Sequence, residues 1–166
     1  MTDDGQEARE RAERALEDHG AFERDGDAFS TADTAVDAHV RAEADGADVV
    51  YRVTVRVPTI DAVVAGETVA PVVREGWYET FERRLEDVGG VTRDEPTAPT
   101  VKLDESADEV VVETEIAAGA PKRAAGDAKA IVDYVEGTFV EGLIPGYTYR
   151  EPAAGLLERA RSSGQQ

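Results

Sequence analysis

Residues 49–60 read Val-Val-Tyr-Arg-Val-Thr-Val-Arg-Val-Pro-Thr-Ile and carry the clearest strand pattern in the sequence. Tyr51 and four valines alternate with a second set that includes Arg52, Thr54 and Arg56. This alternation is typical of a strand that has one buried and one solvated face. The stretch therefore predicts a central strand of an antiparallel sheet that is covered on one side only.

Neighbouring segments supply partners for this strand. Residues 34–43 alternate in the same way and precede this strand by a single turn. The two segments should therefore pair antiparallel. Residues 22–31 contain an Asp-Gly-Asp turn and predict a hairpin or one bent strand. A second hairpin is expected from residues 100–103 and 109–116. Together these segments predict a sheet of about five strands.

The strongest amphipathic pattern lies in residues 71–88. Pro71 suits the first position of a helix, and two glycines at 89 and 90 end it. One stripe collects the apolar side chains Val73, Trp77, Phe81, Leu85 and Val88. Burial of the larger ones stabilises a fold by about 2 kcal/mol each. We therefore expect this helix to cover the valine face of the sheet.

Three further helices complete the predicted order. Residues 5–19 carry a thin apolar stripe of alanines and Leu16, and residues 151–161 use Leu156, Leu157 and Ala160. Between them, residues 121–143 predict a long helix. Its buried stripe is Ala124, Ala128, Ile131, Val132, Val135 and Phe139.

The order is helix, three or four strands, helix, two strands, long helix and short helix. It predicts one α+β domain over residues 1–166, with an ordered core at 7–161 and helices packed on one face of the sheet.

The charge balance restricts the environment and the partners. The chain has 36 acidic and 18 basic residues, a formal charge of −18, and only three lysines. Surplus acid with little lysine is typical of proteins in molar salt, where the Debye length falls to about 3 Å. We expect a halophilic cytoplasm. The same charge argues against nucleic acid and anionic membranes as partners.

Motifs for chemistry are scarce. There is no cysteine, no apolar run of about 20 residues and no signal peptide, so we expect a cytoplasmic protein without disulfides. The two histidines, His19 and His39, lack the spacing of a metal site, and none of the four serines lies in a nucleophile elbow. The sequence favours a non-enzymatic protein without cofactor or metal.

Three segments carry a resemblance to known proteins. Residues 50–59 (Val-Tyr-Arg-Val-Thr-Val-Arg-Val-Pro-Thr), 76–81 (Gly-Trp-Tyr-Glu-Thr-Phe) and 134–152 resemble an uncharacterised family of small acidic haloarchaeal proteins. The resemblance spans residues 7–161 and implies no activity, so it assigns no functional residue. The element order is also similar to the YbjN-like and type III secretion chaperone-like fold, in topology only.

The polar face of the predicted sheet is one candidate site. His39, Arg52 and Arg56 should lie on it, and the two arginines could anchor an anionic or peptide ligand. The alternative is charge pairing between neighbouring strands, worth about 0.2–1 kcal/mol per pair. Arginines facing acids on adjacent strands favour this alternative.

Aromatic residues form the second candidate. Tyr78 lies off its helix stripe, while Leu143, Ile144, Tyr147 and Tyr149 follow the stop of the long helix. Tyrosine favours interfaces, so these residues predict a patch for a partner or a second copy. Alternatively, the tyrosines cover the core edge and bond through their hydroxyls.

The sequence thus favours a chaperone-like adaptor that binds a protein or peptide, and it leaves a homodimer open. The second hypothesis is an enzyme or small-ligand protein with a pocket between sheet and helices.

Overall fold

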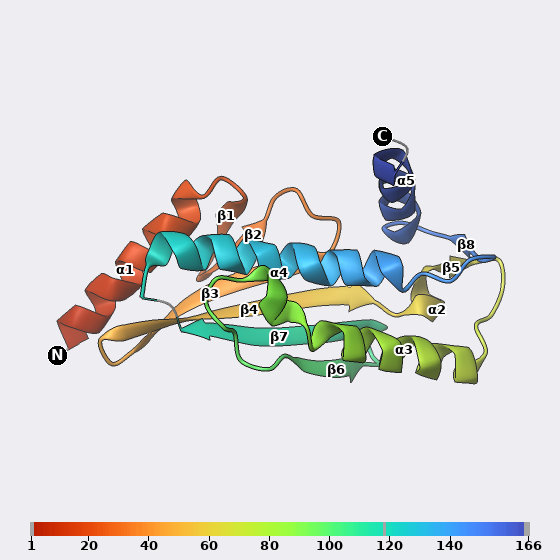
Figure 1. The fold of residues 1–166 in the computed structure, drawn as a ribbon, viewed down its shortest axis with the longest axis horizontal. Helices are drawn as coiled ribbons and strands as arrows, with labels where there is room; N and C mark the ends of the chain where they lie inside the picture. Colours follow the sequence, from red (N-terminus) through yellow and green to blue (C-terminus); the bar gives the residue numbers. More distant parts are fainter. Residues whose placement is uncertain (1, 118, 165–166) are drawn as a thin grey trace.

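The computed structural model describes residues 2–117 and 119–164, with the side chains of residues 4–117 and 119–163. Its centre is a six-stranded antiparallel sheet in the order β1-β2-β3-β4-β7-β6 (Figure 1). The strands are β1 Phe22–Asp25, β2 Ala28–Thr31, β3 Asp37–Asp45, β4 Asp48–Pro58, β6 Thr100–Asp104 and β7 Glu109–Ala117. A separate two-stranded sheet pairs β5 Val64–Ala65 with β8 Thr148–Tyr149.

The helices follow the predicted order and confirm the α+β class. They are α1 Thr2–Asp18, α2 Ile60–Val63, α3 Pro71–Leu85, the 3-10 turn η1 Val88–Val91, α4 Pro121–Glu141 and α5 Ala153–Gly164. Figure 1 shows α1 and α4 side by side over the sheet, with α5 standing away from it at the C-terminus.

Strand β4 is central, as its alternation predicts. Tyr51, Val55 and Val57 are fully buried on its inner face, whereas Arg52 on the other face is exposed. Antiparallel partners flank it on both sides, with β3 and β7 each in register along most of its length. The inner face continues onto β7, where Val110, Val112, Thr114 and Ile116 are buried.

The sheet has six strands where about five are expected. Residues 22–31 form two complete strands around a turn at Gly26, whose φ of +63° lies in the region that glycine tolerates. Strand β3 begins at Asp37 and not at Thr34. The Thr34 hydroxyl bonds to Val36 O at 3.2 Å, and Ala35 N donates to Glu136 of α4 at 2.9 Å. These side-chain bonds hold residues 34–36 in a turn outside the ladder.

The expectation that α3 covers the valine face is wrong. Helices α4 and α1 pack on β4, whereas α3 packs on α4 and α2. At 21 residues α4 extends about 31 Å, close to the roughly 36 Å of β4, and its alanines at 124, 125 and 128 allow close approach. Trp77 and Phe81 of α3 are still buried, with their rings stacked at 5.6 Å.

The C-terminal segment differs in two details from expectation. Thr148 and Tyr149, which lie outside the predicted strands, form β8 by pairing with β5, and Arg150 N donates to Val63 O at 2.7 Å. On α5, Leu156 is buried but Ala160 is exposed, because the main contacts of this helix are with α4 and β8. Among the described residues, no helix combines the length and apolar character needed to cross a membrane.

Candidate functional site

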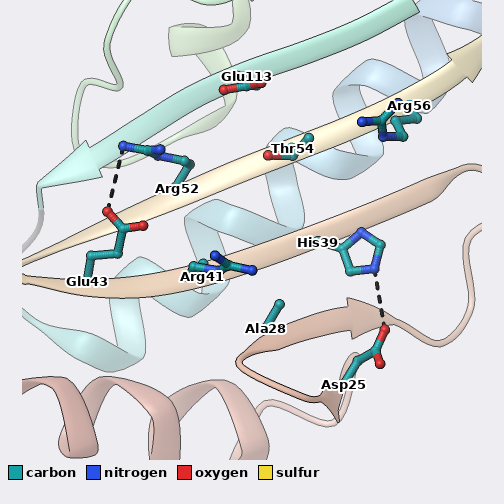
Figure 2. Close-up of a pocket in the computed structure, with 9 residues that line it drawn as sticks. All are labelled: Asp25, Ala28, His39, Arg41, Glu43, Arg52, Thr54, Arg56 and Glu113. Carbon is teal, nitrogen blue, oxygen red and sulfur yellow. Dashed lines mark ion pairs between the residues drawn. The ribbon is translucent and has the colours of Figure 1, made fainter. Parts of the chain in front are cut away.

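The uncovered face of the sheet carries a shallow basin of about 510 Å³ (Figure 2). The predicted residues His39, Arg52 and Arg56 do come together here. Their side chains are 37%, 45% and 38% exposed. The other lining residues are Asp25, Ala28, Arg41, Glu43, Thr54 and Glu113. The basin lies on the side of the sheet opposite the helices, so it is not the expected pocket between sheet and helices.

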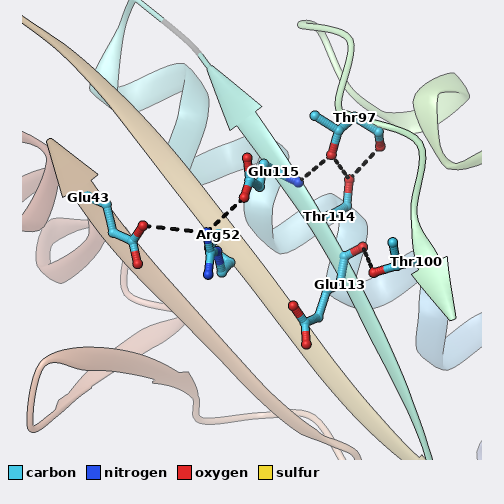
Figure 3. A network of polar contacts seen from close by, with 7 residues as sticks. All are labelled: Glu43, Arg52, Thr97, Thr100, Glu113, Thr114 and Glu115. Atoms are coloured by element: carbon cyan, nitrogen blue, oxygen red, sulfur yellow. Dashed lines mark hydrogen bonds and ion pairs between the residues drawn. The ribbon is translucent and has the colours of Figure 1, made fainter. Parts of the chain in front are cut away.

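Carboxylates already occupy the predicted anchors. Arg52 lies 3.0 Å from Glu115 on β7 and 3.6 Å from Glu43 on β3 (Figure 3). Arg56 lies 3.6 Å from each of two further acids, on β6 and β7. His39 lies between two aspartates, at 3.4 and 3.5 Å. These contacts are the cross-strand charge pairing that the alternating acids and arginines predict, and they leave the basin close to neutral.

The predicted aromatic patch is divided between two places. Leu143, Ile144, Tyr147 and Tyr149 lie together beyond α4, where Leu143 is 8% exposed and the tyrosines are half-buried. The Tyr149 hydroxyl accepts from Ile144 N at 2.7 Å and donates to Ile144 O at 2.8 Å. Burial raises the pKa of Tyr149. This cluster thus matches the alternative in which tyrosines cover the core edge.

Tyr78 lies apart from that cluster, between α3 and the edge strand β6. Its hydroxyl donates to Val101 O at 3.2 Å. Desolvation, followed by the nearby charge of Glu82, raises the pKa of Tyr78. The phenol therefore stays neutral and remains a hydrogen-bond donor well above neutral pH.

Strand β6 is an edge of the sheet, and the direction of its main-chain groups follows from β7. The Glu115 N–H donates to Thr97 Oγ1, and the Glu115 carbonyl accepts from Thr97 N, both at 2.9 Å (Figure 3). Odd-numbered residues of β7 therefore face the edge. The register pairs them with Thr100, Lys102 and Asp104. It follows that the N–H and C=O groups of Val101 and Leu103 point to the free side, from which Tyr78 bonds to Val101.

A hollow of about 130 Å³ adjoins this edge on the helix side of the sheet. It is lined by Thr59, Arg74, Glu75, Trp77, Tyr78, Glu79 and Leu103. Thr59 is fully buried, and its hydroxyl has no hydrogen-bond partner in the described part of the chain. Leu103, in contrast, is one of the exposed large apolar side chains. The hollow therefore offers apolar walls and one unsatisfied hydroxyl beside an open strand edge.

Of the residues that line this hollow, the sequence singled out Tyr78 as a binding residue, as part of the aromatic patch. It did not single out Thr59, Trp77 or Leu103 as site residues. Trp77 belongs to the core stripe, and its indole Nε1 lies close to Gly142, the residue that caps the C-terminus of α4. Leu103 could have been suspected as an apolar residue in a short, otherwise polar strand. Nothing in the sequence marks Thr59, because its burial depends on how β4, α2 and α3 meet.

Metal ligands are not gathered in the described part of the chain. Within residues 2–117 and 119–164, no group of three or more His, Asp or Glu side chains is placed to hold a metal ion. The candidate sites are therefore a charge-paired sheet face, an aromatic core edge, and an open strand edge with its hollow.

Comparison with known proteins adds a family without a described activity. No curated protein and no solved structure matches the chain. Residues 17–159 match a family described as a family of unknown function (DUF5813). This match spans most of the fold, from the end of α1 through β6 and its hollow to α5. The chain therefore belongs to the DUF5813 family of unknown function.

Proposed function

We propose that the protein is a non-enzymatic adaptor that binds an extended segment of a partner protein as an added strand along β6. The observation that carries this proposal is the edge of β6 beside the Thr59 hollow, where Val101 and Leu103 direct their N–H and C=O groups away from β7 and the Val101 carbonyl already accepts from Tyr78. Main-chain bonds to an edge strand supply affinity in this mode of recognition, and pockets for alternate side chains supply selectivity.

The surroundings of β6 specify the chemistry of the guest segment. Alternate residues of an added strand point to opposite faces of the sheet. On the helix side, a guest side chain would enter the hollow lined by Leu103 and Thr59. The volume of this hollow, about 130 Å³, suits an apolar side chain of medium size. On the polar side a guest side chain meets Lys102, which is exposed and makes no ion pair with any described residue. The favoured guest therefore alternates apolar and acidic residues.

Two broader expectations belong to the same proposal. The order of helices and strands motivates the likeness to secretion chaperones, which are binding proteins, and it is an analogy in topology. The charge of −18 and the scarcity of lysine support a salt-rich cytoplasm of a haloarchaeal cell as the place of action.

Charge reversal at Lys102 tests the polar side of the guest. We expect the protein to bind a labelled peptide of alternating Val and Glu more tightly than one of alternating Val and Lys. In Lys102→Glu, the difference in binding free energy between the two peptides should shift in favour of the Lys peptide by about 0.5–2 kcal/mol. The reason is that the cross-strand charge pair of residue 102 becomes repulsive with the Glu peptide and attractive with the Lys peptide. Fluorescence anisotropy at 0.5 M KCl measures both affinities.

Two controls separate strand addition from general charge effects. Arg161→Glu, on the exposed part of α5, changes the net charge equally and should leave the preference unchanged. The Val-Glu peptide with alternate N-methyl groups keeps its side chains but loses strand hydrogen bonds, and it should not bind. Bound peptide should also slow hydrogen exchange at Val101 and Leu103. Equal binding of the methylated peptide would refute strand addition.

A further inference from the structure

A second surface, on the helix layer, has a charge opposite to that of the molecule. Two adjoining hollows of about 680 and 600 Å³ share His19 and Lys122. They lie where the end of α1 meets the start of α4, which run beside each other in Figure 1. We call this surface the α1–α4 basin. The remaining lining residues are Arg11, Arg14, Ala15, Asp18, Val91, Arg93, Ala120, Pro121, Arg123, Gly126, Asp127 and Ala130.

The basin concentrates positive charge in an acidic protein. Five Lys or Arg side chains line it against two Asp, whereas the whole chain has twice as many acids as bases. Arg123 is paired with Asp94 at 3.0 Å. The other four cations make no ion pair with any side chain that the structure describes: Arg11, Arg14, Arg93 and Lys122.

The four cations without ion pairs contrast with the arginines of the sheet face, where Arg52 and Arg56 each contact two carboxylates. Both surfaces are built from the same acid-rich chain. Unpaired cations placed together repel one another, and an anion would relieve that repulsion. The difference therefore selects the α1–α4 basin, and not the sheet face, as the anion site.

The architecture of the basin holds its cations in place. Asp127 of α4 is 4% exposed, and its two carboxylate oxygens accept from Arg93 N at 2.9 Å and Asp94 N at 3.0 Å. These bonds fasten the loop after η1 onto α4, so Arg93 is carried to the side of Lys122. Gly126 leaves the floor open, because a Cβ there would meet no atom within 4 Å.

We infer that the α1–α4 basin binds a small, multiply charged phosphate ligand of the polyphosphate class. Several cations within one hollow match a ligand that carries several charges. Arginine pairs with phosphate oxygens in a bidentate fork, and lysine acts on them as a point charge. Each hollow also lies within the roughly 300–1,000 Å³ usual for small-molecule sites. This inference is independent of strand addition at β6.

Isothermal titration with inorganic pyrophosphate and tripolyphosphate, at 0.15 M KCl and with folding checked by circular dichroism, tests the site. We expect the double variant Arg14→Gln/Lys122→Gln to weaken tripolyphosphate binding by about tenfold or more. The matched control Arg83→Gln/Arg84→Gln removes the same charge from the exposed face of α3 and should change binding less than about twofold.

Filling the floor of the basin gives a test that leaves the charge unchanged. Gly126→Met should abolish binding while keeping the melting temperature, since methionine is a better helix former than glycine. The inference is overturned if neither anion binds the folded protein, or if both double variants weaken binding equally. It is also overturned if only a single-stranded oligonucleotide binds, which would indicate a nucleic-acid surface.

Discussion

At the scale of single residues, Tyr51 carries one of the buried polar atoms that lack a hydrogen-bond partner among the described residues. Tyr51 of β4 is fully buried, and its hydroxyl has no hydrogen-bond partner in the described part of the chain. Desolvation alone raises the pKa of Tyr51 to about 12, because a phenolate without contacts is costly among apolar side chains. The residue thus fills the core with its ring at the expense of one unsatisfied hydroxyl.

This state predicts a loss of stability in alkali. An unfolded tyrosine ionises near pH 10, whereas folded Tyr51 keeps its proton to about pH 12. Between these values the unfolded state binds fewer protons, so the free energy of unfolding falls by about 1.4 kcal/mol per pH unit. Tyr51→Phe has no ionisable hydroxyl at this position. Its free energy of unfolding should therefore rise relative to that of the wild type by about 1.4 kcal/mol per pH unit in this range.

Urea unfolding at pH 7, 10 and 11.5 measures the difference between the two proteins. At pH 7, Tyr51→Phe should be equal or more stable by about 1 kcal/mol, since it removes an unpaired hydroxyl. Parallel pH profiles would show that the Tyr51 hydroxyl is hydrated or bonded in solution.

At the scale of elements, the packing divides the molecule into a rigid body and an appended lobe. Helix α4 packs on α1, β4 and β7, so it links the sheet to the helix layer. Helix α5 packs mainly on α4 and β8, and β8 pairs with the two residues of β5. Elements with few buried contacts open first. We therefore place the lowest local stability in residues 143–164.

The hydroxyl of Tyr149 ties β8 to the segment after α4 within this lobe. Tyr149→Phe removes its two bonds to the main chain of Ile144. Hydrogen exchange at Ile144 and in α5 should become faster, corresponding to about 1–2 kcal/mol of local opening. The amides of β4 should keep their protection. Equal acceleration in β4 would mean that the lobe and the sheet unfold as one unit.

At the scale of the whole molecule, charge is the dominant variable. A formal charge of −18 on 166 residues creates repulsion that favours expansion of the chain. Salt screens this repulsion, with a Debye length of about 10 Å at 0.1 M and 3 Å at 1 M. Ion pairs such as Arg52–Glu115 are exposed and weaken in the same salt, but they are few beside the surplus of acids.

The melting temperature should therefore rise between 0.1 and 2 M KCl. The variant Glu82→Gln/Glu86→Gln, which neutralises two exposed acids at the end of α3, should show a smaller rise because less repulsion remains to be screened. Differential scanning calorimetry measures both proteins. A melting temperature that falls with KCl would show that ion pairs outweigh repulsion.

Local patterns were sufficient to predict most elements of the fold. The alternation in β4 and β7 and the stripes of α3 and α4 arise from side chains a few residues apart, so each could be read from its own segment. The cross-strand register then placed His39, Arg52 and Arg56 on one face. The paired state of these arginines also followed from the alternation of charge along adjacent strands.

Composition and the spacing of residues within single segments were enough to predict the α+β class, the sheet covered on one side and the surplus of acidic residues. The packing of α4 on β4, the burial of Thr59 beside the edge of β6, and the placement of Arg14 and Lys122 in one hollow emerge only in the folded molecule. Each of these brings together segments far apart in the chain. Such contacts depend on the lengths and approach distances of packed elements, and no local period encodes those.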